Sequence, residues 1–112
     1  MQVPDEHRAC IRRWCASQVP ASQRDSVLIS YSERAGRVTL SQRRAPTYPE
    51  LATGWSTAPI AQLRYDPATE RWSLLWPDSG GRWHRYPTET KATTPQPLLE
   101  IVDADPTGIF WG

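Results

Sequence analysis

The chain has 112 residues and a formal net charge of +1 at pH 7. This length suits a single domain over residues 1–112, which would bury roughly two thirds of the surface that its unfolded chain exposes. No stretch reaches the roughly eighteen apolar residues of a membrane span, and residues 1–6 lack the order of a secretory signal. A cytoplasmic protein with no membrane partner is therefore expected.

The two cysteines, Cys10 and Cys15, indicate neither a disulfide nor a metal site. They lie in a segment expected to be helical, where their spacing points them about 140° apart around the axis. They are expected to be reduced, buried or half-buried thiols. His7 precedes Cys10 closely, but no second pair of ligands follows, so no metal or other cofactor is expected.

Charged residues are unevenly spread along the chain. Residues 7–44 contain many arginines but only Asp25 and Glu33 as acids, whereas residues 100–105 are acidic. This asymmetry is compatible with a one-sided positive field. The alternative is a GC-rich genome, which would produce an excess of arginine without any functional cause.

The first predicted element is a helix over residues 5–19. Acidic residues directly after Pro4 favour a helix amino terminus. Ile11 and Trp14 then follow a helical spacing, and Pro20 ends the element. The apolar stripe of this helix needs another element to cover it.

A sheet is the predicted cover. Two β-rich runs, residues 27–31 and 37–41, are separated by a short polar turn with Gly36, a pattern that predicts a hairpin. Residues 45–59 contain several prolines and a glycine, so a long loop is expected there.

Three further strands and a second helix complete the predicted fold. The strands cover residues 60–65, 71–76 and 82–86, and the helix covers residues 95–104. Turns rich in Asp, Pro and Gly join the strands, which indicates an antiparallel meander. The prediction is an α+β fold, in which an N-terminal helix packs on an antiparallel meander of about five strands. A short C-terminal helix and an aromatic tail over residues 108–112 follow.

Alternation along the meander predicts which side chains face the core. One face carries the apolar residues Ala61, Leu63, Tyr65, Trp72, Leu74 and Trp76. If Trp83 joins that face, the opposite one carries the polar residues Gln62, Arg64, Arg71, Ser73, Arg82, His84 and Tyr86. A bulge at Gly80-Gly81 would instead exchange Trp83 and His84 between the faces.

This polar set allows two interpretations. Guanidinium, imidazole and phenol groups on one face could bind an anion or a nucleic-acid backbone, with Arg64, Arg71, Arg82, His84 and Tyr86 as the contacting residues. The structural interpretation is that the face is simply solvated, because antiparallel sheets often leave one face in water.

Four segments carry a resemblance to a known family. They are Pro59–Tyr65, Trp72–Trp76, Arg82–Tyr86 and Asp103–Gly112. In this order they resemble the bacterial domain-of-unknown-function family 3024, over nearly the whole chain. The resemblance implies a small stand-alone protein with a helix, a strand-rich middle that carries a Trp-His-x-Tyr element, and an aromatic–glycine end. It implies no reaction, cofactor or catalytic residue.

Most tryptophans are expected to fill the core, because the chain has few aliphatic residues. Trp55 and Trp111, on a loop and a tail, are the expected exceptions. No nucleophile elbow or phosphate-cradling glycine loop is present, so catalytic residues are not assigned.

Three hypotheses for function follow. The first is a non-enzymatic binding module whose cationic sheet face contacts an anionic partner, with nucleic acid as the first candidate. The second is a protein-interaction or homodimerisation module that uses Trp55, Phe110 and Trp111. The third, hydrolase chemistry around His84, rests only on the polar neighbours of that residue.

Overall fold

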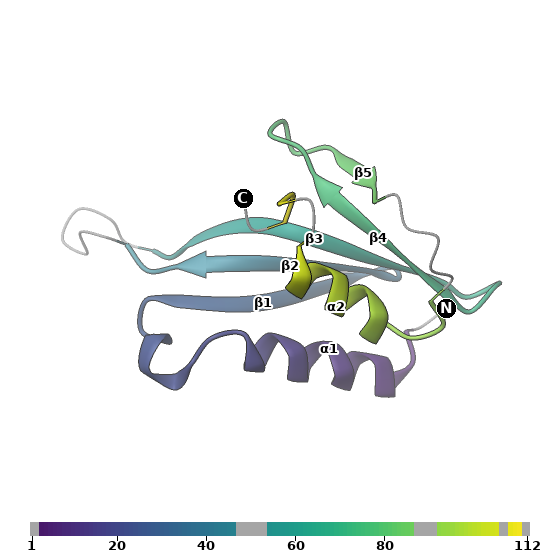
Figure 1. The fold of residues 1–112 in the computed structure, drawn as a ribbon, viewed down its shortest axis with the longest axis horizontal. Helices are drawn as coiled ribbons and strands as arrows, with labels where there is room; N and C mark the ends of the chain where they lie inside the picture. Colours follow the sequence, from purple (N-terminus) through teal and green to yellow (C-terminus); the bar gives the residue numbers. More distant parts are fainter. Residues whose placement is uncertain (1–2, 47–53, 87–91, 106–107, 111–112) are drawn as a thin grey trace.

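The structure is a computed structural model that describes residues 3–46, 54–86, 92–105 and 108–110 (Figure 1). Its elements, in chain order, are α1 (Asp5–Ser17), the 3-10 turn η1 (Ala21–Gln23), β1 (Val27–Arg34), β2 (Arg37–Arg44), β3 (Ser56–Asp66), β4 (Arg71–Pro77), β5 (Trp83–Arg85) and α2 (Gln96–Ala104). The strands form one sheet in the order β1-β2-β3-β4-β5, with each neighbouring pair antiparallel. The predicted α+β fold is confirmed.

Helix α1 begins where predicted but ends at Ser17, two residues early. Its buried side chains are Ile11, Trp14 and Cys15, which lie on one stripe. The early end has a local cause, because Pro20 disfavours helical geometry in the residue before it. Neither α1 nor α2, the α-helices of the described residues, is long and apolar enough to cross a membrane.

Strand β3 is longer than predicted. Residues 56–59 were expected to belong to a loop, but they pair with residues 41–44 of β2. The pairing register shifts between Leu40 and Ser41, so Pro59 lies beside an irregularity of the ladder. Proline is tolerated at such positions because its missing N–H removes no regular ladder bond. The prediction of a loop is therefore wrong over residues 56–59.

Both helices cover the same face of the sheet. Figure 1 shows α1 running alongside β1, with α2 lying across the neighbouring strands on the same side. Between them and the strands lies the core, to which α2 contributes Leu98, Leu99 and Val102. Strands β3 and β4 contribute residues predicted for the core face, among them Leu63 and Leu74, which are directly opposite each other, and β2 adds Val38 and Leu40. No described helix covers the opposite face.

Polar side chains fasten the two helices in place. The Arg8 guanidinium donates from Nε to Glu33 Oε1 at 2.6 Å and from a terminal nitrogen to Glu33 Oε2 at 2.7 Å, which joins α1 to β1. The indole N–H of Trp14 donates to Asp103 Oδ2 at 3.1 Å, which joins α1 to α2. These bonds orient elements that apolar packing alone would leave free to slide.

The packing of α1 predicts a difference between the two thiols. Both cysteines are free, and burial raises the pKa of Cys15 to about 11. At pH 8 only roughly 0.1% of Cys15 is then thiolate, the form that reacts. We expect iodoacetamide to label half-buried Cys10 first, and Cys15 only when urea unfolds the chain, as read by mass spectrometry. Equal labelling of both thiols in the native protein would contradict this packing.

Candidate functional site

The face of the sheet opposite the helices carries a group of arginines. Alternation of side chains along each strand, together with the strand register, places them there. We call their shared surface the arginine face, formed by Arg34, Arg37, Arg43, Arg64, Arg71 and Arg85. The one acidic strand residue on this face is Asp66, at the end of β3 opposite Arg71.

A tight turn brings two of these arginines together. Arg34 and Arg37 are partners at the end of the β1–β2 hairpin, and only Ala35 and Gly36 separate them. Both turn residues have positive φ, 51° and 79°, which is the requirement of a type I′ turn. Gly36 is needed here because a Cβ at this position would approach the Tyr65 carbonyl oxygen to 3.2 Å.

The arginines continue across the next strand. Arg37 lies directly opposite Arg64 of β3, so Arg34, Arg37 and Arg64 form a row across three strands. Partial burial, followed by the positive charges of Arg37 and Arg85, lowers the pKa of Arg64. Like charges placed opposite each other in a sheet are destabilising. The row therefore concentrates positive charge at a cost to stability.

A buried amide orients the row. Gln62 is 6% exposed, and its Oε1 accepts a hydrogen bond of 2.7 Å from Arg64 Nε. Its Nε2 donates to Thr39 Oγ1 at 3.0 Å. All three side chains lie on the face away from the helices, and the two bonds hold the Arg64 guanidinium in a defined position over the strands.

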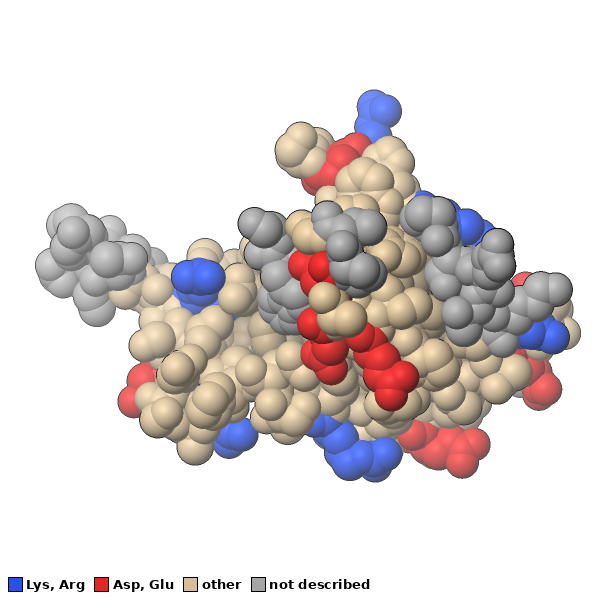
Figure 2. Space-filling model, viewed as in Figure 1, with Lys and Arg blue, Asp and Glu red and all other residues tan. Residues whose placement is uncertain are grey.

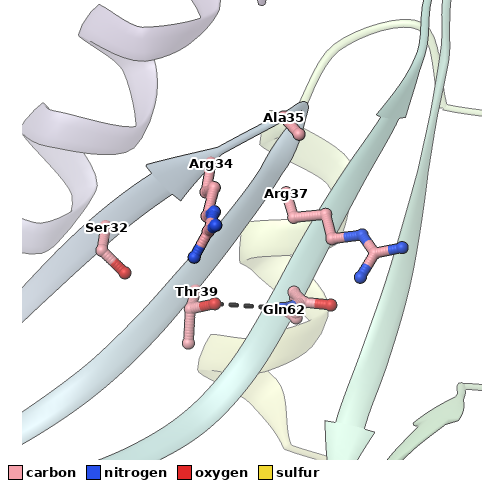
Figure 3. Close-up of a pocket in the computed structure, with 6 residues that line it drawn as sticks. All are labelled: Ser32, Arg34, Ala35, Arg37, Thr39 and Gln62. Atoms are coloured by element: carbon pink, nitrogen blue, oxygen red, sulfur yellow. Dashed lines mark hydrogen bonds between the residues drawn. The ribbon is translucent and has the colours of Figure 1, made fainter.

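A shallow hollow of about 430 Å³ opens on this face beside the hairpin turn. It is lined by Ser32, Arg34, Ala35, Arg37, Thr39 and Gln62. Figure 3 shows these side chains on the near side of the strands, with α2 behind the sheet. The hollow thus combines two guanidiniums with hydroxyl and amide groups.

Two tryptophans lie at the borders of the arginine face. Trp83 is half-buried and pairs with Pro77, which puts it on the same side as Arg85. Trp55, just before β3, is half-buried, and the Arg43 guanidinium lies 5.9 Å from its ring centre. Aromatic rings beside arginines offer stacking surfaces as well as charge.

The predicted placement of His84 and Tyr86 with Arg64 is wrong. His84 pairs with Trp76 on the side that carries the helices, and their rings stack with centroids 4.7 Å apart. The amide of Tyr86 donates to the Leu74 carbonyl, and its side chain is 7% exposed in the core beside Phe110. The phase of β5 is the one that the predicted Gly80-Gly81 bulge would have produced.

His84 and Arg82 are parts of one turn. Asp78 Oδ1 accepts hydrogen bonds from the backbone N–H groups of Gly80 and Arg82, while its Oδ2 lies 2.7 Å from His84 Nε2. The bond from His84, and then those from the backbone, hold the pKa of Asp78 below its ordinary value. Arg82 is exposed in this turn, outside the strands. Of the predicted binding residues, only Arg64 and Arg71 lie on the arginine face.

The predicted aromatic interface is divided as well. Phe110 is 4% exposed and packs against Tyr86, so it belongs to the core. Trp55 is half-buried beside Arg43. Trp111 lies outside the described residues. The hypothesis of an exposed aromatic surface thus loses Phe110.

On the helix-bearing side, the charged side chains over α2 are negative, in contrast to the positive arginine face. Figure 2 shows acidic side chains gathered where Figure 1 places this helix. Glu100 and Asp103 are exposed there, and half-buried Asp105 follows the helix. The acidic group over α2 is thus separated by the sheet from the arginine face. Among the described residues, no cluster of His, Cys, Asp and Glu is suited to hold a metal ion.

Sequence reasoning missed Arg34, Arg37, Arg43 and Arg85 as site residues. A signal for two of them was present, because Arg37 and Arg43 alternate with buried Val38 and Leu40 in β2. The same period-two argument that was applied to β3 and β4 would have placed them opposite the core.

Comparison with known proteins identifies a family and nothing closer. No curated protein is significantly similar to the chain, and no solved structure is. A family model does match, over residues 2–112, which is nearly the whole length. With that extent of match, the chain belongs to the family described as domain of unknown function DUF3024.

Proposed function

We propose that this protein is a non-enzymatic binding module whose arginine face contacts the backbone of a nucleic acid. One observation carries the proposal: Arg34, Arg37 and Arg64 stand side by side on the sheet face that no described helix covers. Within the described part of the chain, none of these three residues takes part in a salt bridge.

The chemistry of the face favours a polyanion. Opposed guanidiniums repel each other, and a bound anion compensates that repulsion while water and salt do so only partly. Guanidinium groups pair with phosphate oxygens through two parallel hydrogen bonds, and a nucleic-acid backbone repeats that group at regular intervals. A flat, two-dimensional array of arginines suits a repeated phosphate better than one small anion.

The tryptophans favour a single strand over a duplex. Trp83 lies on the face beside Arg85, and Trp55 lies near Arg43 at another border. Bases of a single strand can stack on such rings, whereas those of a duplex are already stacked on each other. We assign the protein to the bacterial cytoplasm, a reducing compartment that suits its free Cys10 and Cys15.

The test is a fluorescence titration of the protein with short oligonucleotides at several salt concentrations. We expect single-stranded binding whose affinity falls steeply with salt, because each phosphate contact releases counterions. The Arg37→Gln/Arg85→Gln double variant should bind more weakly and lower the log–log salt slope by about 0.7 for each lost contact. An unchanged slope in this variant would contradict the proposal.

Two variants serve as controls. Arg12→Gln/Arg13→Gln removes the same charge from exposed positions on α1, away from the arginine face, and should retain the slope. His84→Gln should retain both affinity and slope, because that side chain stacks on Trp76 on the other side of the sheet. Equal losses in all three variants would indicate non-specific attraction, and absence of oligonucleotide binding at low salt would overturn the proposal.

A further inference from the structure

We propose that the hollow beside the β1–β2 turn is a site for a terminal phosphate, the phosphomonoester at the end of a nucleic-acid strand. The inference deepens the proposed function, and the identification of the strand rests on it. The hollow itself is defined independently, by its volume of about 430 Å³ and by the polar side chains that line it.

The charge of the hollow exceeds what an internal phosphate can compensate. Arg34 and Arg37 line it, and Arg64 follows in the same cross-strand row. Neighbouring strands are about 4.8 Å apart, so these three long side chains can reach a common ligand. A phosphodiester carries a single negative charge, whereas a phosphomonoester carries about −1.5 to −2 at pH 7 and offers three strong acceptor oxygens. The monoester is the better match for the two guanidiniums that line the hollow and the third that lies next in the row.

The hollow also has donors that are already oriented. Thr39 and Gln62 form its floor in Figure 3, joined by their 3.0 Å hydrogen bond. Gln62 is nearly completely buried and fixes the Arg64 guanidinium from the side. The hydroxyl of Ser32, exposed at the edge of the hollow, is a further donor. Donors that are ordered before binding lose little conformational entropy when the ligand arrives.

The position of the hollow favours the end of a strand over a free phosphate. It lies beside the hairpin turn, at one end of β1 and β2, and Arg64 and Arg85 continue the arginine face from there. A nucleic-acid strand whose terminal phosphate occupies the hollow would place its next phosphates over those arginines. Free phosphate would gain only the contacts of the hollow.

The experiment compares hexathymidylate carrying a 5′-phosphate, a 3′-phosphate or hydroxyls at both ends, with inorganic phosphate as the fourth ligand. Affinities are measured by tryptophan fluorescence, and binding positions by backbone amide shifts in NMR spectra. We expect one of the phosphorylated oligomers to bind at least about tenfold more tightly than the hydroxyl form. Its extra amide shifts should lie at residues 32–39 and 62–64.

Arg34→Gln/Arg37→Gln should abolish this preference. Arg43→Gln, at the far end of the same strand β2, should weaken all oligomers equally and leave the preference intact. Salt-sensitive binding without any preference for a terminal phosphate would overturn the inference but leave the proposed function standing. If inorganic phosphate shifts the amide signals at the hollow but no oligomer binds, both the proposed function and the assignment of the phosphate to a nucleic-acid strand would be overturned. Inorganic phosphate that binds as tightly as the phosphorylated oligomer would overturn that assignment alone.

Discussion

Replacing Leu63 by Ala is expected to lower the free energy of unfolding by about 2–5 kcal/mol. The side chain is fully buried, between Val38 of β2 and Leu74 of β4 on the helix-bearing face. Truncation removes its transfer free energy and leaves a cavity that strands cannot easily close. Since a domain of this size has about 5–15 kcal/mol of stability, the loss should be evident in urea unfolding followed by tryptophan fluorescence.

Two matched substitutions isolate the cause. Leu63→Met nearly conserves volume and should cost less than about 1.5 kcal/mol. Leu28→Ala makes the same truncation at a half-buried position on the other face of the sheet, paired with Arg43, and should cost less than Leu63→Ala. Equal effects of Leu28→Ala and Leu63→Ala would mean that the helices do not cover the face assigned to the core.

The position of Leu63 connects this core to the arginine face. Its chain neighbours Gln62 and Arg64 point to the opposite side of the same strand, where they form part of the hydrogen-bonded row. Anchoring of Leu63 therefore fixes the height and register of those two side chains. We expect the Leu63→Ala molecules that remain folded to bind oligonucleotides. The loss of apparent affinity should therefore match the loss of folded protein.

Much of the fold could be predicted because the local patterns agree with one another. The apolar stripe of α1, the β-rich runs and the turn residues each indicate one element, and the alternation in β3 and β4 indicates the core face. The predicted choice of core face is confirmed by the burial and pairing of Leu63, Leu74 and Trp72. The family resemblance, which the match over residues 2–112 confirms, supported this architecture and no activity.

The phase of β5 could not be predicted, since one residue of turn length decides it. Asp78 and Arg82 close the turn through a backbone hydrogen bond, so Pro77 is opposite Trp83 and Trp76 is opposite His84. A turn shorter or longer by one residue would have placed Trp83 on the core face. Gly81, with φ of 82°, provides the backbone geometry of the observed turn.

The candidate site needed tertiary information for a similar reason. Arg34, Arg37 and Arg64 come from different strands, and only the register of the hairpin and of β3 brings them into one row. A further irregularity, between Leu40 and Ser41 and next to Pro59, changes the pairing of β2 with residues 56–59 and leaves this row in place. Composition indicated an excess of arginine, but it could not place those side chains on one face.

Replacing Glu33 by Gln should make the stability of the protein less dependent on pH. The Glu33 carboxylate accepts two short hydrogen bonds from Arg8, and these bonds lower its pKa in the folded protein below the ordinary value of 4.5. The side chain is only 20% exposed, so solvent screens the pair incompletely. We expect Glu33→Gln to cost about 1–2 kcal/mol at pH 7.

The sign of the pH effect follows from the lowered pKa. The folded state binds the Glu33 proton less readily than the unfolded state, so the pair stabilises the fold fully above about pH 4.5 and progressively loses that contribution below it. Urea unfolding at pH 7, 5 and 3 should show the difference between wild type and Glu33→Gln shrinking toward zero. Glu6→Gln removes an exposed acid from α1, the helix that carries Arg8, and is the control for loss of a negative charge without loss of the pair.

A difference that stays constant with pH would contradict the role assigned to the Arg8–Glu33 pair, because a neutral contact would not titrate. The pair joins α1 to β1 on the helix-bearing side, away from the arginine face. At pH 7, Glu33→Gln should therefore lose stability and retain oligonucleotide affinity. Arg37→Gln/Arg85→Gln should show the opposite combination, since removing repulsion from exposed arginines leaves the fold intact or slightly more stable. Opposite responses of these two variants would separate the scaffold from the binding surface.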